Sequence, residues 1–92
     1  MIRSAFVISA LVAAAVLCAP TAAADDNSYL TKLQDRYEFL TPQQLLAEGY
    51  RVCAAERSGV LSPAKTTMVM NDLTVGTSTA LEIVSAAEWD LC

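Results

Sequence analysis

The sequence predicts an all-α fold, a compact bundle of about four short helices stapled by one disulfide. Apolar residues recur at helical spacing in four successive segments, and no segment alternates apolar and polar residues as a half-buried strand does. Proline, glycine or hydroxyl residues of the kind found at helix ends bound these segments. Two cysteines, Cys53 and Cys92, remain once an N-terminal leader is removed, so only one intramolecular pairing is possible.

Residues 1–24 have the pattern of a cleaved secretory signal peptide. A short start containing Arg3 precedes an apolar run over residues 5–17, and the alanines of residues 22–24 supply the small-residue site that signal peptidase accepts. The run is too short to cross a bilayer, and Pro20 ends any helix before the cleavage site. We therefore expect cleavage after Ala24 and export through the general secretory route.

Cys18 raises the alternative of a lipid-anchored protein. Lipoprotein processing needs a small residue directly before the modified cysteine, and Leu17 occupies that position. We therefore expect no stable membrane anchor in the mature chain. The protein is expected to be secreted or held in the cell envelope.

Residues 25–92 are expected to form a single domain with an acidic surface. All ten acidic residues lie in this range, whereas one of the six basic residues, Arg3, lies in the leader, which leaves a net charge of −5. Nucleic acids and anionic membrane surfaces bind clusters of lysine and arginine. The composition therefore argues against both as partners.

A bridge between Cys53 and Cys92 is expected to supply much of the stability of so small a domain. A chain of 68 residues is near the lower limit for folding on its core alone. Exported proteins mature in an oxidising space, and closing a loop of roughly 40 residues contributes about 4 kcal/mol on the chain-entropy estimate. The alternative, a free thiol nucleophile, has no histidine to activate it.

The first two helices are predicted on either side of Thr41. The first takes its N-cap from residues 25–28 and ends at about Leu40, with an apolar stripe of Tyr29, Leu30, Leu33, Tyr37 and Leu40. Thr41, Pro42 and Gln44 have the pattern of a capping box that opens the second helix, which stops at Gly59. Its stripe consists of Leu45, Leu46, Gly49, Val52 and Cys53. Gly49 in a helix interior indicates that another helix backbone approaches closely.

The last two helices are predicted from Ser62 onward. Ser62 and Pro63 have the same cap-then-proline pattern, and the stripe of the third helix is Thr66, Val69, Met70 and Leu73. A break follows at residues 76–79, where Thr79 and Glu82 have the spacing of a further capping box. The stripe of the last helix is Ala80, Ile83, Val84, Ala87 and Leu91.

Several of these features occur together in a known family. The alanine-rich leader is followed by a helix that contains Gly49 and Cys53 and closes at Gly59, and the final helix carries Ala86-Ala87 and an aromatic residue before Cys92. This pattern resembles the small mycobacterial secreted proteins classed as domain of unknown function 732. The resemblance covers the mature chain and implies an exported actinobacterial helical domain with its two cysteines bridged. It implies no activity.

The chain offers few groups for catalysis or metal binding. Histidine is absent, both mature cysteines are better used as a bridge, and the acids are scattered over helix surfaces. We therefore expect no enzyme activity, no metal and no cofactor. Glu56 is the one candidate binding carboxylate, because helical spacing puts it on the stripe with Leu45 and Val52. The alternative is that Glu56 lies in the last turn, where the helix leaves the core.

Trp89 is the candidate binding aromatic. Helical spacing places it nearly opposite the apolar stripe of the last helix, where an exposed indole would act as an anchor for a partner. The alternative is that Trp89 covers the first helix beside Tyr29 and Leu33.

Two hypotheses for function follow from these observations. The first is a non-enzymatic interaction module that binds a protein partner in the envelope or the extracellular space. The alternative is a small carrier of a hydrophobic ligand, lipid or haem, held between helices. Haem would need tyrosine or methionine as its axial ligand, because no histidine is available.

Overall fold

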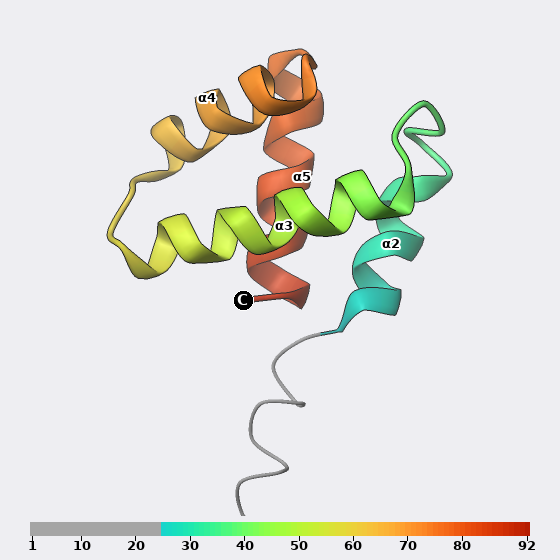
Figure 1. The fold of residues 1–92 in the computed structure, drawn as a ribbon, viewed down its shortest axis with the longest axis horizontal. Coiled ribbons are helices and arrows are strands. Elements are labelled where there is room, and N and C mark those ends of the chain that lie inside the picture. The colour runs from blue at the N-terminus through green and yellow to red at the C-terminus, as the bar shows by residue number, and fades with distance from the viewer. Residues whose placement is uncertain (1–24) are drawn as a thin grey trace, which may run out of the picture.

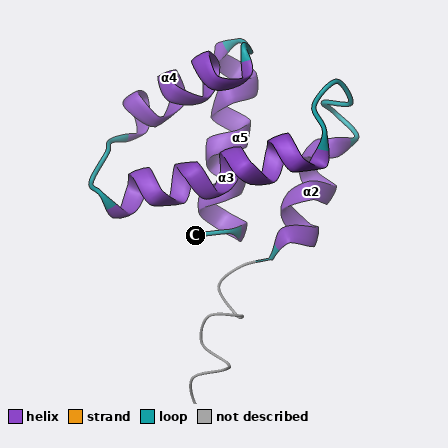
Figure 2. Cartoon of the chain, in the orientation of Figure 1, coloured by secondary structure: helices purple, strands orange, loops and turns teal. Residues whose placement is uncertain are grey.

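The computed structural model describes residues 25–92, and these residues form four helices and no strand (Figures 1 and 2). The helices are α2 (Asp26–Gln34), α3 (Pro42–Arg57), α4 (Ser62–Leu73) and α5 (Thr77–Asp90). The predicted all-α fold is confirmed. The predicted leader, including Cys18, lies outside the described residues. Within the described range, no helix is long and apolar enough to cross a membrane.

Helices α3 and α5 form the centre of the bundle, because they pack against each other and each also packs against α2 and α4. Figure 1 shows α3 running across α5, with α4 near the start of α5. The stripe predicted for this helix is confirmed, since all of its residues are buried: Ala80, Ile83, Val84, Ala87 and Leu91. Tyr29, Leu33, Leu45, Val52 and Val69 complete the core from the other three helices. Burying one side of α5 on three neighbours leaves its opposite side to solvent.

The start and end of α3 follow the sequence prediction. The Thr41 side chain accepts a hydrogen bond from the Gln44 backbone N–H at 3.1 Å, and the Gln44 side chain accepts one from the Thr41 N–H at 2.9 Å. This reciprocal pair is the predicted capping box. At the other end, Gly59 has φ of +86°, the left-handed conformation that glycine adopts without steric cost.

The predicted end of the first helix is wrong. Helix α2 ends at Gln34, and residues 35–40 form turns in which the Tyr37 N–H donates to the Leu33 carbonyl. The physical reason is tertiary. Leaving the helix early brings Arg36 and the Tyr37 hydroxyl to Glu82 of α5, while Leu40 is still buried. The apolar spacing up to Leu40 therefore reflects burial in a turn rather than a continued helix.

The predicted caps of the last two helices are also wrong. Leu61, not Ser62, is the N-cap residue of α4, and no side chain caps that helix. Helix α5 starts at Thr77 after Gly76, two residues before the predicted Thr79 cap. The Glu82 side chain makes no capping box, because both of its oxygens bind Arg36 and Tyr37.

The Cys53–Cys92 disulfide joins the final residue to the interior of α3. The two Cα atoms lie 5.2 Å apart, and Cys53 is buried, as the apolar stripe of α3 predicts. The bridge spans a sequence separation of 39 residues. It fixes the end of α5 on α3.

Gly49 is where the end of α5 meets α3. A Cβ atom at this position would lie 2.5 Å from Leu91 Cδ1 and 2.8 Å from the Tyr29 ring. The close neighbours are therefore side chains and not the helix backbone predicted from the sequence. The Tyr29 hydroxyl donates to the Leu45 carbonyl, so its ring has little freedom to move away.

Removing the disulfide should destabilise the protein strongly. We expect Cys92→Ser to lower the free energy of unfolding by about 2 to 5 kcal/mol, because the tether on α5 is lost and the core is small. Thermal denaturation monitored by circular dichroism measures this loss. Reduction of the wild-type protein should produce a similar loss, and an unchanged melting temperature in both cases would contradict the prediction.

Gly49→Ala should destabilise the protein even though alanine favours helices. The helix-propensity gain is about 1 kcal/mol, whereas crowding Leu91 and the tethered Tyr29 ring should outweigh it and give a net loss of about 1 to 2 kcal/mol. Gly76→Ala is the matched control, since nothing lies within 4 Å of its added Cβ. That variant should change stability by less than about 1 kcal/mol. Equal melting temperatures for the two variants would refute close packing at Gly49.

Candidate functional site

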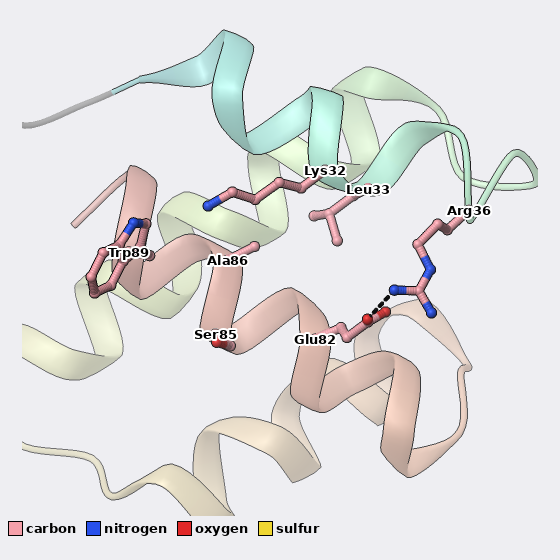
Figure 3. Close-up of a pocket in the computed structure, with 7 residues that line it drawn as sticks. All are labelled: Lys32, Leu33, Arg36, Glu82, Ser85, Ala86 and Trp89. Atoms are coloured by element: carbon pink, nitrogen blue, oxygen red, sulfur yellow. Dashed lines mark hydrogen bonds and ion pairs between the residues drawn. The ribbon is translucent and has the colours of Figure 1, made fainter.

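An open groove of about 480 Å³ lies between α2 and α5 (Figure 3). We call it the Trp89 groove. The residues that line it are Lys32, Leu33, Arg36, Glu82, Ser85, Ala86 and Trp89. The first three come from α2 and the turn after it, and the others come from α5. The groove thus forms where the outer face of α5 passes beside α2.

Trp89 stands at one end of this groove and projects into solvent (Figure 3). Its side chain is 83% exposed, the largest exposure among the large hydrophobic residues described. The interpretation in which Trp89 covers Tyr29 and Leu33 is wrong, because those residues are buried while the indole remains in water. Helical spacing therefore placed the residue correctly. A role for Trp89 in binding stays a prediction.

The floor of the groove is narrow and apolar. Leu33 and Ala86 are buried, and the small side chains Ser85 and Ala86 leave room between Trp89 and α2. The apolar surface that a partner can contact is therefore mainly the indole itself.

Two ion pairs connect the walls of the groove. Lys32 Nζ lies 2.7 Å from Asp90 Oδ2, and Arg36 Nη1 binds Glu82 Oε2. The Tyr37 hydroxyl donates to the other Glu82 oxygen, and this hydrogen bond raises the pKa of Tyr37. Because the cations lie on the α2 side and the carboxylates on α5, the pairs also hold the two walls together.

Glu56, the second predicted binding residue, is not part of the Trp89 groove. Its side chain is about half exposed in the last turn of α3, as the alternative interpretation predicted, and lies 3.4 Å from Lys65 Nζ. The structure therefore does not bring Glu56 and Trp89 together at one site.

Lys65 is a buried charge that the sequence analysis missed. Its side chain contacts Glu88 of α5 as well as Glu56 of α3, so one ammonium group connects three helices. The Glu88 hydrogen bond raises the pKa of Lys65 against the opposing effect of burial. The sequence did contain a signal for this burial. Lys65 lies four residues before Val69, so helical spacing places both residues on the apolar side of α4.

Glu48 is the other residue that the sequence analysis missed. It is only 5% exposed, and its Oε2 atom finds no hydrogen-bond partner within the described chain. Burial raises its pKa to about 8, helped by the Asp72 carboxyl within hydrogen-bonding reach and opposed by Arg51. The raised pKa favours the neutral form of the Glu48 carboxyl at neutral pH. The sequence signal for this burial was the position of Glu48 between Leu45 and Val52 on the apolar stripe of α3.

The Trp89 groove presents an exposed indole and charged side chains, and the buried Glu48 is not among the residues that line it. No group of three or more potential metal ligands from cysteine, aspartate or glutamate occurs within residues 25–92.

Comparison with known proteins adds no relative. No family model matches the chain, and no curated protein or solved structure matches it. Function must therefore be argued from the site itself.

Glu48→Gln should change how stability depends on pH. The unfolded chain releases the Glu48 proton near its ordinary pKa, 4.5, whereas the folded protein holds it to about 8. Wild-type stability should therefore fall as pH rises between these values. Because the glutamine side chain stays neutral throughout, the stability advantage of the variant should grow to about 4 kcal/mol at pH 8. Urea denaturation at pH 4.5 and pH 8 measures this difference.

The control for this measurement is Glu38→Gln, which neutralises an exposed carboxyl in the turn after α2. It should follow the wild-type pH dependence. Parallel profiles for Glu48→Gln and wild type would show that Glu48 is ionised in the folded protein.

Proposed function

We propose that this protein is a non-enzymatic interaction module that binds a protein partner through the Trp89 groove. The observation that carries the proposal is the 83% exposed indole beside an apolar floor. Tryptophan is enriched among the residues that dominate binding energy at protein interfaces. Leaving so large an apolar side chain in water has no benefit for folding, because the same helix buries five other apolar side chains.

The rigidity of the groove supports the same proposal. Trp89 lies three residues before Cys92, whose disulfide fixes the end of α5 on α3. The Lys32–Asp90 pair joins that end to α2. An anchor held in place before binding loses less conformational entropy when a partner docks.

A protein partner fits the open shape of the groove better than a small ligand. Sites for small molecules bury most of the ligand surface. Here the residues on the rim remain largely exposed, with Lys32 at 45% and Arg36 at 62% of their side chains. A partner that covers the rim from outside suits this geometry.

The alternative, a carrier of a hydrophobic ligand, is favoured by a second groove. It measures about 440 Å³ and is lined by Ser62, Pro63, Thr66, Thr67, Met70, Thr77 and Leu81. The hydroxyls of Thr66 and Thr67 donate to backbone carbonyls of their own helix, and Thr77 donates to the Met70 sulfur. With these hydroxyls engaged, an acyl chain is the suitable occupant. A haem would need the Met70 sulfur as its axial ligand, and that sulfur already accepts a hydrogen bond from Thr77.

The proposal includes export. We infer that residues 1–24 direct the chain through the general secretory route and are removed after Ala24, which places the protein in the envelope or outside the cell. A disulfide is typical of those oxidising compartments. Asp25 caps α2, and its backbone N–H donates to the Asp90 carbonyl, so a chain that starts at Asp25 keeps both contacts. Membership of the mycobacterial family of domain of unknown function 732 is part of this proposal.

Site-specific photocrosslinking in cells that naturally make the protein tests the proposed function. A benzophenone side chain in place of Ser85, inside the groove, should crosslink to a discrete protein. Trp89→Ala should abolish the crosslink, because the anchor is lost. Leu61→Ala, which removes an exposed side chain outside the groove, should retain it.

Two results of this test would contradict the proposal. A crosslink that persists in a folded Trp89→Ala protein would show that the groove is not the binding site. A small molecule retained in native mass spectra of the protein from the same cells, with no Trp89-dependent crosslink, would favour the carrier.

A further inference from the structure

The carboxylates and the cations around the Trp89 groove differ in how far a partner can still bind them. Both oxygens of Glu82 already accept hydrogen bonds, one from Arg36 and one from Tyr37. Asp90 Oδ2 lies 2.7 Å from Lys32 Nζ without accepting a hydrogen bond, but the Asp90 side chain is only 10% exposed. A partner therefore finds Glu82 already paired and Asp90 out of reach.

The two cations keep most of their capacity. A guanidinium has five N–H donors, and Arg36 uses its Nη1 atom for Glu82. An ammonium has three donors, and Lys32 Nζ meets one carboxylate. Both side chains are substantially exposed on the rim, so the free groups that face an incoming partner are donors.

The position of these cations is unusual for this chain. Acidic residues outnumber basic ones within residues 25–92, and only four of the basic residues described there are exposed. Two of the four, Lys32 and Arg36, line the groove. They are four residues apart, with Lys32 in the last turn of α2 and Arg36 in the turn that follows it.

We propose that the Trp89 groove recognises an acidic, apolar segment of the partner protein. Its carboxylates bind Lys32 and Arg36, and a neighbouring apolar side chain packs against Trp89 and Ala86. This inference rests on the proposed function and specifies the chemistry of the partner at the same site. The matching segment carries two carboxylates about one helical turn apart, as on an amphipathic helix laid in the groove.

The apolar contact and the charges have different roles. Exposed ion pairs contribute modestly and are screened by salt, whereas an aromatic anchor is worth much more. The charges select acidic segments and speed their association. Neutralising one cation should therefore weaken binding several-fold, and removing the indole should weaken it by about 30-fold or more.

Selection of phage-displayed random peptides against the purified, disulfide-bonded protein tests the inference. The peptides are about 16 residues long, so that a helical peptide can span the groove. The enriched peptides should carry two or more acidic residues beside a leucine or an aromatic residue. Fluorescence polarisation of the labelled peptides should show about 2-fold to 5-fold weaker binding to Lys32→Gln and Arg36→Gln. Arg57→Gln, the same type of change at an exposed position outside the groove, should bind like wild type.

The variants separate failure of this inference from failure of the proposed function. Two results would overturn the acidic specificity alone. One is enrichment of peptides that need Trp89 but contain no acidic residues. The other is equal binding of the peptides to Lys32→Gln, Arg36→Gln and Arg57→Gln. A selection that enriches no peptide dependent on Trp89 would overturn both. Self-association of the purified protein that Trp89→Ala abolishes would assign the groove to a second copy and overturn the inference.

Discussion

The contact between the C-terminal end of α5 and the middle of α3 is the constraint on which the rest of the structure depends. Leu91 occupies the space that a Cβ at Gly49 would need, and Cys92 bonds Cys53 one helical turn further along α3. Because α2, α3 and α4 all pack on α5, fixing this end fixes the axis of the whole bundle. Asp90 joins α2 to the same end through Lys32 and through the Asp25 backbone. A domain with so small a core gains from placing its covalent bond where its packing is closest.

The same constraint explains the exposed side of α5. Once Ala87 and Leu91 face the core, helical geometry turns Trp89 and Ser85 away from it. The small side chains of Ser85 and Ala86 then lie between the indole and α2, and the Lys32 and Arg36 pairs border the groove. Lys65, by contrast, is sealed among helices and Glu48 is held as a neutral acid. Lys65 and Glu48 are therefore buried and out of reach of a partner, whereas Lys32 and Arg36 in the groove remain exposed.

Local rules recovered much of the fold from the sequence, and tertiary contacts account for what they missed. The capping box at Thr41 and the apolar stripe of α5 depend on neighbouring residues, and the cysteine pairing had only one solution. The end of α2 was mispredicted because Arg36 and Tyr37 turn to reach Glu82, which is distant in the sequence. For the site, spacing placed Trp89 outside the core but gave no sign of the groove, which needs α2 beside α5. Glu48 and Lys65 lay on apolar stripes, yet only their partners on other helices show why they are buried.

Fluorescence of Trp89, the only tryptophan in the sequence, tests most directly whether the fixed end of α5 holds the indole in water. The oxidised protein should show red-shifted emission that acrylamide quenches readily. Trp89→Ala should then leave stability almost unchanged, far below the roughly 3 to 5 kcal/mol lost with a core tryptophan. Blue-shifted emission protected from acrylamide, together with unfolding of the variant, would place Trp89 in the core and contradict both the packing of α5 and the binding groove.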